Sequence, residues 1–411
     1  MRGPVSEVTF AGLMSTLLMI STLFLAFNVR PARSSPATII VPDDYPTIQA
    51  AIDNASAGDT IFVRAGTYNC SIQIDKPLTL KGENNQNTTL RLQRAKSYPE
   101  LMALHVIASN VTISGFHLIG PESVSDDVML IAVDGRNGVT ADNCVIKNNV
   151  LEEYGTDALV LKGSHNDEVV GNVISSQDGS CMYLRSSNNC LLKNNTLSGS
   201  EWTGIFLDTS SNNTVSNNFI TNQTDSLGGS EHTGAITFGI FSDDNTVTGN
   251  TLVNNDYGVS CLGYTQNNVI YHNNFVNNKQ QANDELDSPQ PPANFWDNGY
   301  PSGGNYWSDY RGNDSFSGPY QNVTGSDGIG DAPYVIDAVS SDRYPLMSPW
   351  KNPVGDVNMD GKVDGKDIAI VALAFGSAPG DLGWNALADV NGDFRIDGKD
   401  IVTVAIHFGK G

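Results

Sequence analysis

The sequence predicts an all-β right-handed parallel β-helix, a solenoid, followed by a small α-helical domain. The middle of the chain repeats with a period of about 23 residues, and repeats of that length are typical of solenoids. Each period contains short strand-like segments such as ALVLK and GIFLD, without a helical pattern. Near the C-terminus an acidic twelve-residue phrase occurs twice, and an apolar helical segment follows each copy. With 411 residues the chain has room for one to three domains.

The repeat is marked by an asparagine that precedes two positions, most often β-branched or apolar. This asparagine falls at Asn149, Asn172, Asn195, Asn218, Asn250 and Asn274, in steps of 23, 23, 23, 32 and 24 residues. The positions predicted to point inward and stack into a core are Val150, Val173, Phe219 and Leu252. Asparagine tolerates the left-handed backbone of a bend, and its amide can bond to the asparagine one coil above.

The cysteines do not form a disulfide framework, because they are odd in number and widely scattered. They are Cys70, Cys144, Cys181, Cys190 and Cys261. The repeat places Cys144 and Cys190 at matching positions two coils apart. Two coils span about 10 Å, which is too far for a disulfide bond. We therefore predict free, mostly buried thiols.

Residues 1–37 are expected to be a signal peptide. The apolar run from Leu13 to Phe27 has the length of a signal h-region and is shorter than the about 20 residues that span a membrane. We expect the protein to be secreted or on the cell surface, without membrane association after cleavage. Acids outnumber bases 45 to 23, and the net charge of −22 argues against nucleic acid as a partner, because a polyanion would be repelled.

Residues 38–293 are expected to form the β-helix with its N-terminal cap. The cap sequence runs strand, short helix near Pro46 to Ala55, and strand, and it resembles the cap of pectin-lyase-like β-helix proteins. The repeats, together with the stretches Asn294–Gly312 and Gly325–Ile336, resemble the NosD-type β-helix family. This resemblance implies the fold. It does not fix the function, because such repeats occur in lyases, hydrolases, epimerases, adhesins and metal-delivery proteins alike.

The NosD resemblance also implies a copper-related accessory role, which we keep as a weaker alternative. Copper(I) prefers clustered Cys, Met or His ligands. The histidines are dispersed, at His105, His117, His165, His232 and His272, and neither Met-x-x-Met nor Cys-x-x-Cys occurs. The residues themselves therefore do not favour copper.

Candidate catalytic residues lie in one repeat. Tyr154 and Asp157 form a Tyr-Gly-x-Asp stretch that resembles part of a mannuronan-epimerase active site, although the family's Pro-His is replaced here by Ala-Leu. His165 and Asp167 follow and could lie nearby on the same coil. The alternative is a polar turn beside a strand. Whether the protein is an enzyme stays open, and a polysaccharide lyase, epimerase or glycoside hydrolase would be the type.

Residues 294–350 are rich in aromatic side chains. The cluster comprises Trp296, Tyr300, Tyr306, Trp307 and Tyr310. Flat rings with polar neighbours could stack on sugar faces, which makes these residues candidates for substrate binding. The alternative is a C-terminal cap over the last coil, as an open solenoid end needs one. One surface could serve both purposes.

The doubled phrase has the oxygen-ligand spacing of an EF-hand calcium loop. The ligands of the first copy would be Asp356, Asn358, Asp360, the carbonyl of Lys362, Asp364 and Asp367. Those of the second copy would be Asp389, Asn391, Asp393, the carbonyl of Arg395, Asp397 and Asp400. We predict two calcium ions. The second site should be weaker, because Phe394 replaces the glycine that suits a positive φ at the sixth loop position.

Two loop-helix units about 33 residues apart resemble a dockerin domain, here residues 351–411. In dockerins the tenth and eleventh loop positions help to select a cohesin partner. These positions are Gly365 and Lys366 in the first copy and Gly398 and Lys399 in the second. The resemblance implies a cohesin-like scaffold domain as partner.

Together these features predict an exported β-helix protein that binds extracellular polysaccharide and is attached to a surface scaffold through a calcium-dependent module. The alternative is a dockerin-tethered polysaccharide lyase, epimerase or hydrolase, and the weaker alternative is the copper accessory role.

Overall fold

The computed structural model describes residues 35–92, 100–121, 127–225, 233–284, 294–357, 362–377, 385, 388–391 and 395–410. The expected signal peptide lies almost wholly outside these residues. Within the described part of the chain, no helix is long and apolar enough to cross a membrane.

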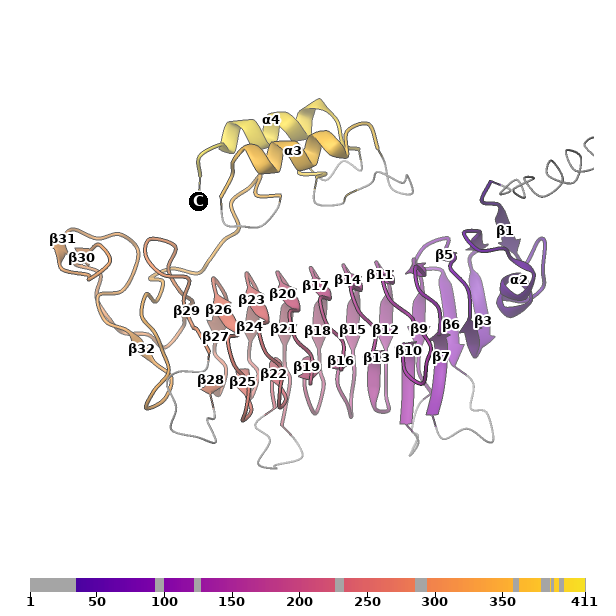
Figure 1. The fold of residues 1–411 in the computed structure, drawn as a ribbon, viewed down its shortest axis with the longest axis horizontal. Helices are drawn as coiled ribbons and strands as arrows, with labels where there is room; N and C mark the ends of the chain where they lie inside the picture. Colours follow the sequence, from indigo (N-terminus) through magenta and orange to yellow (C-terminus); the bar gives the residue numbers. More distant parts are fainter. Residues whose placement is uncertain are drawn as a thin grey trace, which may run out of the picture.

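The described residues form a parallel β-helix with three sheets, which we call A, B and C (Figure 1). Sheet A contains β1 (Thr38–Val41), β2 (Thr60–Val63), β5 (Thr79–Gly82), β8 (Thr112–Ser114), β11 (Val145–Lys147), β14 (Glu168–Val170), β17 (Leu191–Lys193), β20 (Thr214–Ser216), β23 (Thr246–Thr248) and β26 (Val269–Tyr271). Sheet B contains β3 (Gly66–Cys70), β6 (Thr88–Leu92), β9 (His117–Ile119), β12 (Val150–Glu152), β15 (Val173–Ser175), β18 (Thr196–Ser198), β21 (Phe219–Thr221), β24 (Thr251–Val253), β27 (Asn274–Val276) and β29 (Tyr306–Trp307). Sheet C contains β4 (Ile72–Ile74), β7 (Glu100–Val106), β10 (Asp127–Asp134), β13 (Asp157–Lys162), β16 (Met182–Arg185), β19 (Ile205–Asp208), β22 (Ile236–Phe238), β25 (Tyr257–Cys261) and β28 (Gln280–Asp284).

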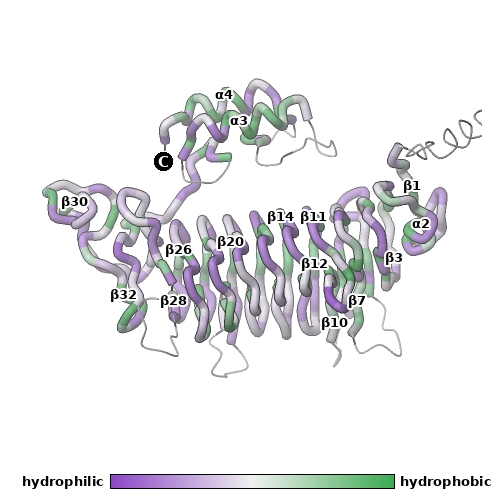
Figure 2. Tube along the Cα trace, viewed as in Figure 1, coloured by the Kyte–Doolittle hydropathy of each residue, from purple (hydrophilic) through white to green (hydrophobic). Residues whose placement is uncertain are grey.

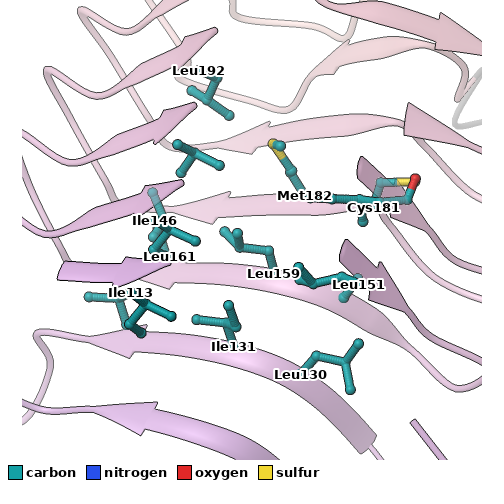
Figure 3. Close-up of a cluster of buried hydrophobic side chains, with 14 of the residues drawn as sticks. Ile113, Leu130, Ile131, Ile146, Leu151, Leu159, Leu161, Cys181, Met182 and Leu192 are labelled. Carbon is teal, nitrogen blue, oxygen red and sulfur yellow. The ribbon is translucent and has the colours of Figure 1, made fainter. Parts of the chain in front are cut away.

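The solenoid interior is a continuous apolar core, because successive coils pair in register. Ile113, Ile146 and Val169 stack in sheet A. Ile131, Leu159 and Met182 stack in sheet C, and Figure 3 shows several of these side chains converging inside the coil. Figure 2 shows polar and apolar positions alternating along the coils. The core is therefore built of a few apolar side chains from each coil, stacked on those of the next.

The inward positions of sheet B are shifted by one residue from the prediction. Val173 and Phe219 are 48% and 43% exposed, whereas Ile174 and Ile220 are fully buried. Val150 is likewise half-buried and outward, and only Leu252 was assigned correctly. The reason is that each three-residue strand presents its middle residue to the core, and the residue directly after the asparagine points outward.

The predicted asparagine ladder is present. Nδ2 of Asn172 donates to Oδ1 of Asn195 at 3.1 Å, and Asn195 donates to Asn218 at 3.0 Å. In the last repeat the ladder residue is Asn273, which accepts from Asn250 at 2.9 Å, so the assignment of Asn274 was wrong by one position. The left-handed backbone lies at the residue before each ladder position, such as Asn194 with φ of 55°.

The thiol prediction is confirmed for four cysteines. Cys144, Cys181, Cys190 and Cys261 are free and buried. The side chain of Cys70 lies outside the described part. Burial raises the pKa of the Cys144 and Cys190 thiols to about 12, so they remain protonated at neutral pH.

Both solenoid ends are covered. The predicted N-terminal helix is α2 (Ile48–Asn54), whose start is capped by the Thr47 hydroxyl accepting from the Ala50 N–H at 3.2 Å. At the other end β29 extends sheet B, followed by two antiparallel pairs. These are β30 (Phe316–Ser317) with β31 (Val323–Thr324), and β32 (Tyr334–Val335) with β33 (Ser341–Asp342).

The C-terminal helices are α3 (Gly365–Leu373) and α4 (Gly398–His407). They share a separate small core that includes Val371, Ile396 and Val404. Asp364 and Asp397 cap them, each with a reciprocal capping box. This module therefore has an apolar core distinct from that of the solenoid.

Candidate functional site

The four candidate catalytic residues do not converge. Tyr154 lies in the turn before β13 and Asp157 is the first residue of that strand, whereas His165 and Asp167 follow its end. Because a strand rises about 3.3 Å per residue, the six residues of β13 hold the two pairs roughly 17 Å apart. Chemistry that needs all four side chains at one point is not supported by this arrangement.

Asp167 occupies a position equivalent to that of a ladder asparagine, and its carboxylate accepts a hydrogen bond from the backbone of the preceding coil. Its Oδ1 accepts from the Cys144 N–H at 2.8 Å, and its Oδ2 accepts from the Ser164 hydroxyl. Burial raises the pKa of Asp167 to about 7. The neighbouring His165 is half-buried and accepts at Nδ1 from the Asn188 N–H at 3.2 Å. These contacts link adjacent coils.

Sequence reasoning missed Glu153, which directly precedes the Tyr-Gly-x-Asp stretch. Its carboxyl is 2% exposed, and Oε1 accepts from the N–H groups of Tyr154 and Gly155 at 2.8 and 2.7 Å. Oε2 has no hydrogen-bond partner within the described residues. Burial raises the pKa of Glu153 to about 7. The glutamate follows a sheet B strand like any polar turn residue, so no sequence signal distinguished it.

The two tryptophans of the aromatic cluster are buried, which corrects their assignment to substrate binding. Trp296 and Trp307 are each 1% exposed, and Trp307 is sandwiched between Phe275 and Tyr334, with ring centroids 4.2 Å away on both sides. Their indole N–H groups donate to buried carboxylates. These rings cover the last coil and have no free face for a sugar. Tyr300, Tyr306 and Tyr310 are half-buried.

A different aromatic cluster lies on the outer face of sheet C. Tyr183 stacks on Phe206 with centroids 5.3 Å apart, and Trp202 lies 4.9 Å from Phe206 and 6.2 Å from Tyr183. We call these three residues the aromatic trio. Tyr183 and Phe206 are register partners on β16 and β19, exactly one repeat apart. Their 23-residue spacing is the signal that could have revealed them.

Charged side chains line the same face beside the trio. Arg136 binds Asp134 through two hydrogen bonds of 2.8 and 2.7 Å. Burial raises the pKa of Asp134, but the hydrogen bonds and charge of Arg136 outweigh it and hold that pKa below its usual value. Tyr183 donates to Asp208 at 2.9 Å, and Arg185 lies 3.8 Å from the same carboxylate. The charges of this face are therefore largely paired with one another.

The calcium loops are partly described, because Asn358, Asp360 and Asp393 lie outside the described residues. The last ligand of each loop, Asp367 and Asp400, is fully buried. Asp367 accepts from the N–H groups of Val357 and Asp364, both at 2.7 Å. It therefore links the beginning of the first loop to its end. Asp400 does the same in the second loop. The ligands predicted for the two loops are all oxygen atoms, which is the kind of ligand that a hard cation such as calcium prefers.

Within the described part, no three His, Cys, Asp or Glu side chains converge on one point, and this holds for the described carboxylates of the calcium loops as it does for the histidines and cysteines that copper would need. The four described cysteines are buried in the solenoid core.

The candidate partner-binding residues lie at equivalent places in the two helices. Gly365 and Lys366 begin α3, and Gly398 and Lys399 begin α4. Gly398 and Lys399 line a shallow hollow with Asp397, Val402 and Thr403. Further along the same two helices, Leu373 is 86% exposed and Ile406 is 68% exposed.

This architecture defines a modular β-helix protein that carries a small, separate α-helical domain. The chain belongs to the family described as periplasmic copper-binding protein (NosD), whose model matches residues 52–312. The dockerin type I domain model matches residues 354–408. Both resemblances predicted from the sequence are confirmed. Dockerin type I domains as a class bind calcium and cohesin partners.

Several solved structures are similar in fold. ORF18 of Geobacillus virus E2 is 12% identical, covering 80% of this chain and 68% of that one, with a TM-score of 0.42. The A-module of Azotobacter vinelandii mannuronan C-5 epimerase AlgE4 is 18% identical, covering 57% and 74%, with a TM-score of 0.40. The alginate lyase of Paenibacillus sp. str. FPU-7 is 14% identical, covering 61% and 99%, with a TM-score of 0.34. No curated protein matches the chain.

Proposed function

We propose that this protein is an exported polysaccharide-binding protein that attaches to a surface scaffold through its dockerin domain. One observation carries the proposal: a dockerin domain and a β-helix with an aromatic trio on its outer face are joined in one chain. Aromatic side chains supply broad, rigid apolar area for contact with a ligand. The apolar run at Leu13–Phe27 supports export.

Attachment to a cohesin-like partner is supported by the exposed surface of α3 and α4. Leu373 and Ile406 are exposed on a domain too small to spare apolar side chains from its core. The two loops would hold calcium ions, the second more weakly, and the ordered loops would then present the lysines at both helix starts.

The test is retention of the calcium-loaded full chain on insoluble polysaccharides, with the variants Trp202→Ala and Tyr320→Ala. We expect Trp202→Ala to weaken binding about tenfold through lost aromatic contact. Tyr320→Ala is the matched control, because this tyrosine is 83% exposed and lies in the C-terminal cap. Absence of retention on every polysaccharide would overturn the proposal.

A tethered polysaccharide lyase, epimerase or hydrolase is the second candidate, and Glu153 favours it. A carboxyl whose pKa is raised to about 7 can donate or accept a proton near neutral pH. The test follows unsaturated products and new reducing ends during incubation with the same polysaccharides. Turnover that Glu153→Gln abolishes, with binding retained, would establish the enzyme.

A further inference from the structure

We infer that Lys193, on the outer face of sheet A, lowers the calcium affinity of the first dockerin loop by placing its positive charge beside Asp356. Packing of this loop on the solenoid and calcium binding to the loop then oppose each other. The inference goes beyond the proposed function, because it concerns the calcium loops and needs no polysaccharide. It depends on a covered patch of sheet A, on the place where the linker is anchored, and on the charges that meet there.

The covered patch consists of two outward residues of sheet A. Lys193 on β17 and Ser216 on β20 are register partners, and they are only 6% and 4% exposed. The same register position on other strands of sheet A is half-buried, at Ser114, Lys147, Val170, Thr248 and Tyr271. A lysine on the outer face of a sheet is rarely buried unless another part of the protein covers it. The outer face of sheet A is therefore covered at β17 and β20.

The linker brings the first dockerin loop to this patch. Nδ2 of Asn352 donates to Oδ1 of Asn217 at 3.1 Å, and Asn217 directly follows Ser216. Asp356 is four residues further on, so its Cα lies at most about 14 Å from that of Asn352. Asp356 is itself only 6% exposed, and Figure 1 shows α3 and α4 on this side of the solenoid. The start of the first loop is therefore the part of the dockerin domain that lies nearest to Lys193.

The charge of Asp356 acts on Lys193 across the two domains. Burial lowers the pKa of Lys193 to about 8, and the carboxylates of Asp356 and Glu168 partly offset this fall. The contribution of Asp356 is the larger of the two, although Glu168 belongs to the neighbouring strand β14 of the same sheet. The lysine therefore interacts more strongly with the dockerin loop than with the acidic side chain of its own sheet.

Asp356 is also the first ligand predicted for the first calcium loop. A bound calcium ion brings two positive charges to this carboxylate. Like charges that are close together repel more strongly where water is partly excluded, as it is around the buried Lys193. Lys193 therefore disfavours calcium in the first loop. By linkage, calcium in the loop weakens the contact between the loop and sheet A by the same factor.

The experiment titrates calcium into the chelator-treated full chain by calorimetry and resolves the two loops as separate binding steps. We expect Lys193→Gln to tighten one site about fivefold and Lys193→Glu to tighten it further, because they remove or reverse the repelling charge. Lys193→Arg keeps the charge and should bind as the unmodified protein does. Lys147→Gln is the matched control, because Lys147 holds the same register position two strands away. In an Asp389→Asn background, which weakens the second loop, the site that Lys193→Gln tightens should remain.

The outcomes decide the inference in both directions. Equal calcium affinities in Lys193→Gln and Lys147→Gln would overturn it. Tightening in Lys193→Arg as large as in Lys193→Gln would overturn it as well, because packing and not charge would then be the cause. A change of equal size in both loops would contradict a local effect at Asp356. Absence of calcium binding by the unmodified chain would overturn the calcium loops and this inference together, and would leave polysaccharide binding untouched.

Discussion

A single ladder asparagine satisfies polar groups of several coils at once. Asn195 donates from Nδ2 to the Val169 carbonyl at 2.8 Å and to Asn218 at 3.0 Å. Its Oδ1 accepts from both the backbone N–H and Nδ2 of Asn172, at 2.9 and 3.1 Å. The coil corners are buried and lie outside the strands, so their backbone groups depend on these side chains.

Asn195→Ala is therefore expected to lower the free energy of unfolding by about 2–4 kcal/mol, since it leaves buried donors and acceptors unpaired. Thr196→Ala, at the exposed next position, should change it by less than about 0.5 kcal/mol. Urea unfolding of the two variants beside the unmodified protein makes the comparison. Equal stability of the two variants would contradict a role for the ladder.

Asp167 stands where later coils carry asparagine, at Asn213 and Asn245. Its pKa is raised from 3.8 to about 7 by burial, so the folded protein binds this proton more tightly than the unfolded chain does. Stability should therefore rise as the pH falls from about 7 toward 4, the interval between the folded and unfolded pKa values. Asp167→Asn removes the cost of the buried charge, and we expect it to stabilise the protein at pH 8 by about 1–3 kcal/mol.

The measurement is the unfolding free energy of Asp167→Asn and the unmodified protein at pH 8 and pH 5. The gain should shrink at pH 5, where the aspartate is already protonated. Asp53→Asn, at an exposed carboxyl, is the control. A variant that is less stable at both pH values would show that the ionised carboxylate is needed.

At the scale of elements, the strong 23-residue period predicted the solenoid. It did not predict which residue of each three-residue strand points inward. Val173 and Phe219 were assigned inward because the period locates a strand but not which of its faces is buried. Two apolar residues often follow these asparagines, so the sequence is compatible with either of the two pointing into the core. The aromatic trio was missed because its members are adjacent in space only through cross-coil register. Glu153 was missed because its raised pKa arises from burial, which sequence does not report.

The helices α3 and α4 after the two acidic phrases were predicted, because an apolar helical pattern is a local property of the chain, whereas the calcium ligands of the loops stay a prediction. Calcium removal tests whether they fold as a unit. The core of this module, around Val371 and Val404, is small and separate from the solenoid core. We expect a chelator to abolish the helical circular-dichroism signal of α3 and α4 and leave the solenoid's thermal midpoint unchanged. Readdition of calcium should restore the helices, whereas helices that persist in chelator would show that the apolar core alone suffices.

At the scale of the molecule, the linker between the solenoid and the dockerin domain lies against the solenoid. The Trp350 indole stacks on His272 with centroids 3.5 Å apart and planes 10° apart. Asn274 binds the Trp350 backbone at both N–H and carbonyl, at 2.6 and 3.0 Å. Asn352 donates to Asn217 at 3.1 Å. The linker is thus fixed to the solenoid at residues 350–352, and Figure 1 shows α3 and α4 above the coils.

Trp350→Ala is expected to loosen this attachment without unfolding either domain, because the stack joins two separate cores. The side chain of the adjacent Lys351 is exposed, so trypsin cleavage after it reports how often the linker lifts from the solenoid. We expect cleavage about fivefold faster in Trp350→Ala, since the backbone bonds to Asn274 remain. Phe295→Ala, at a half-exposed ring in the cap, should be cleaved at the original rate. Burial lowers the pKa of His272 to about 4, so its imidazole is neutral at the neutral pH of the trypsin assay. Equal rates in all three proteins would mean that the asparagine contacts alone hold the linker, and that the indole stack adds nothing to the placement of the docking domain.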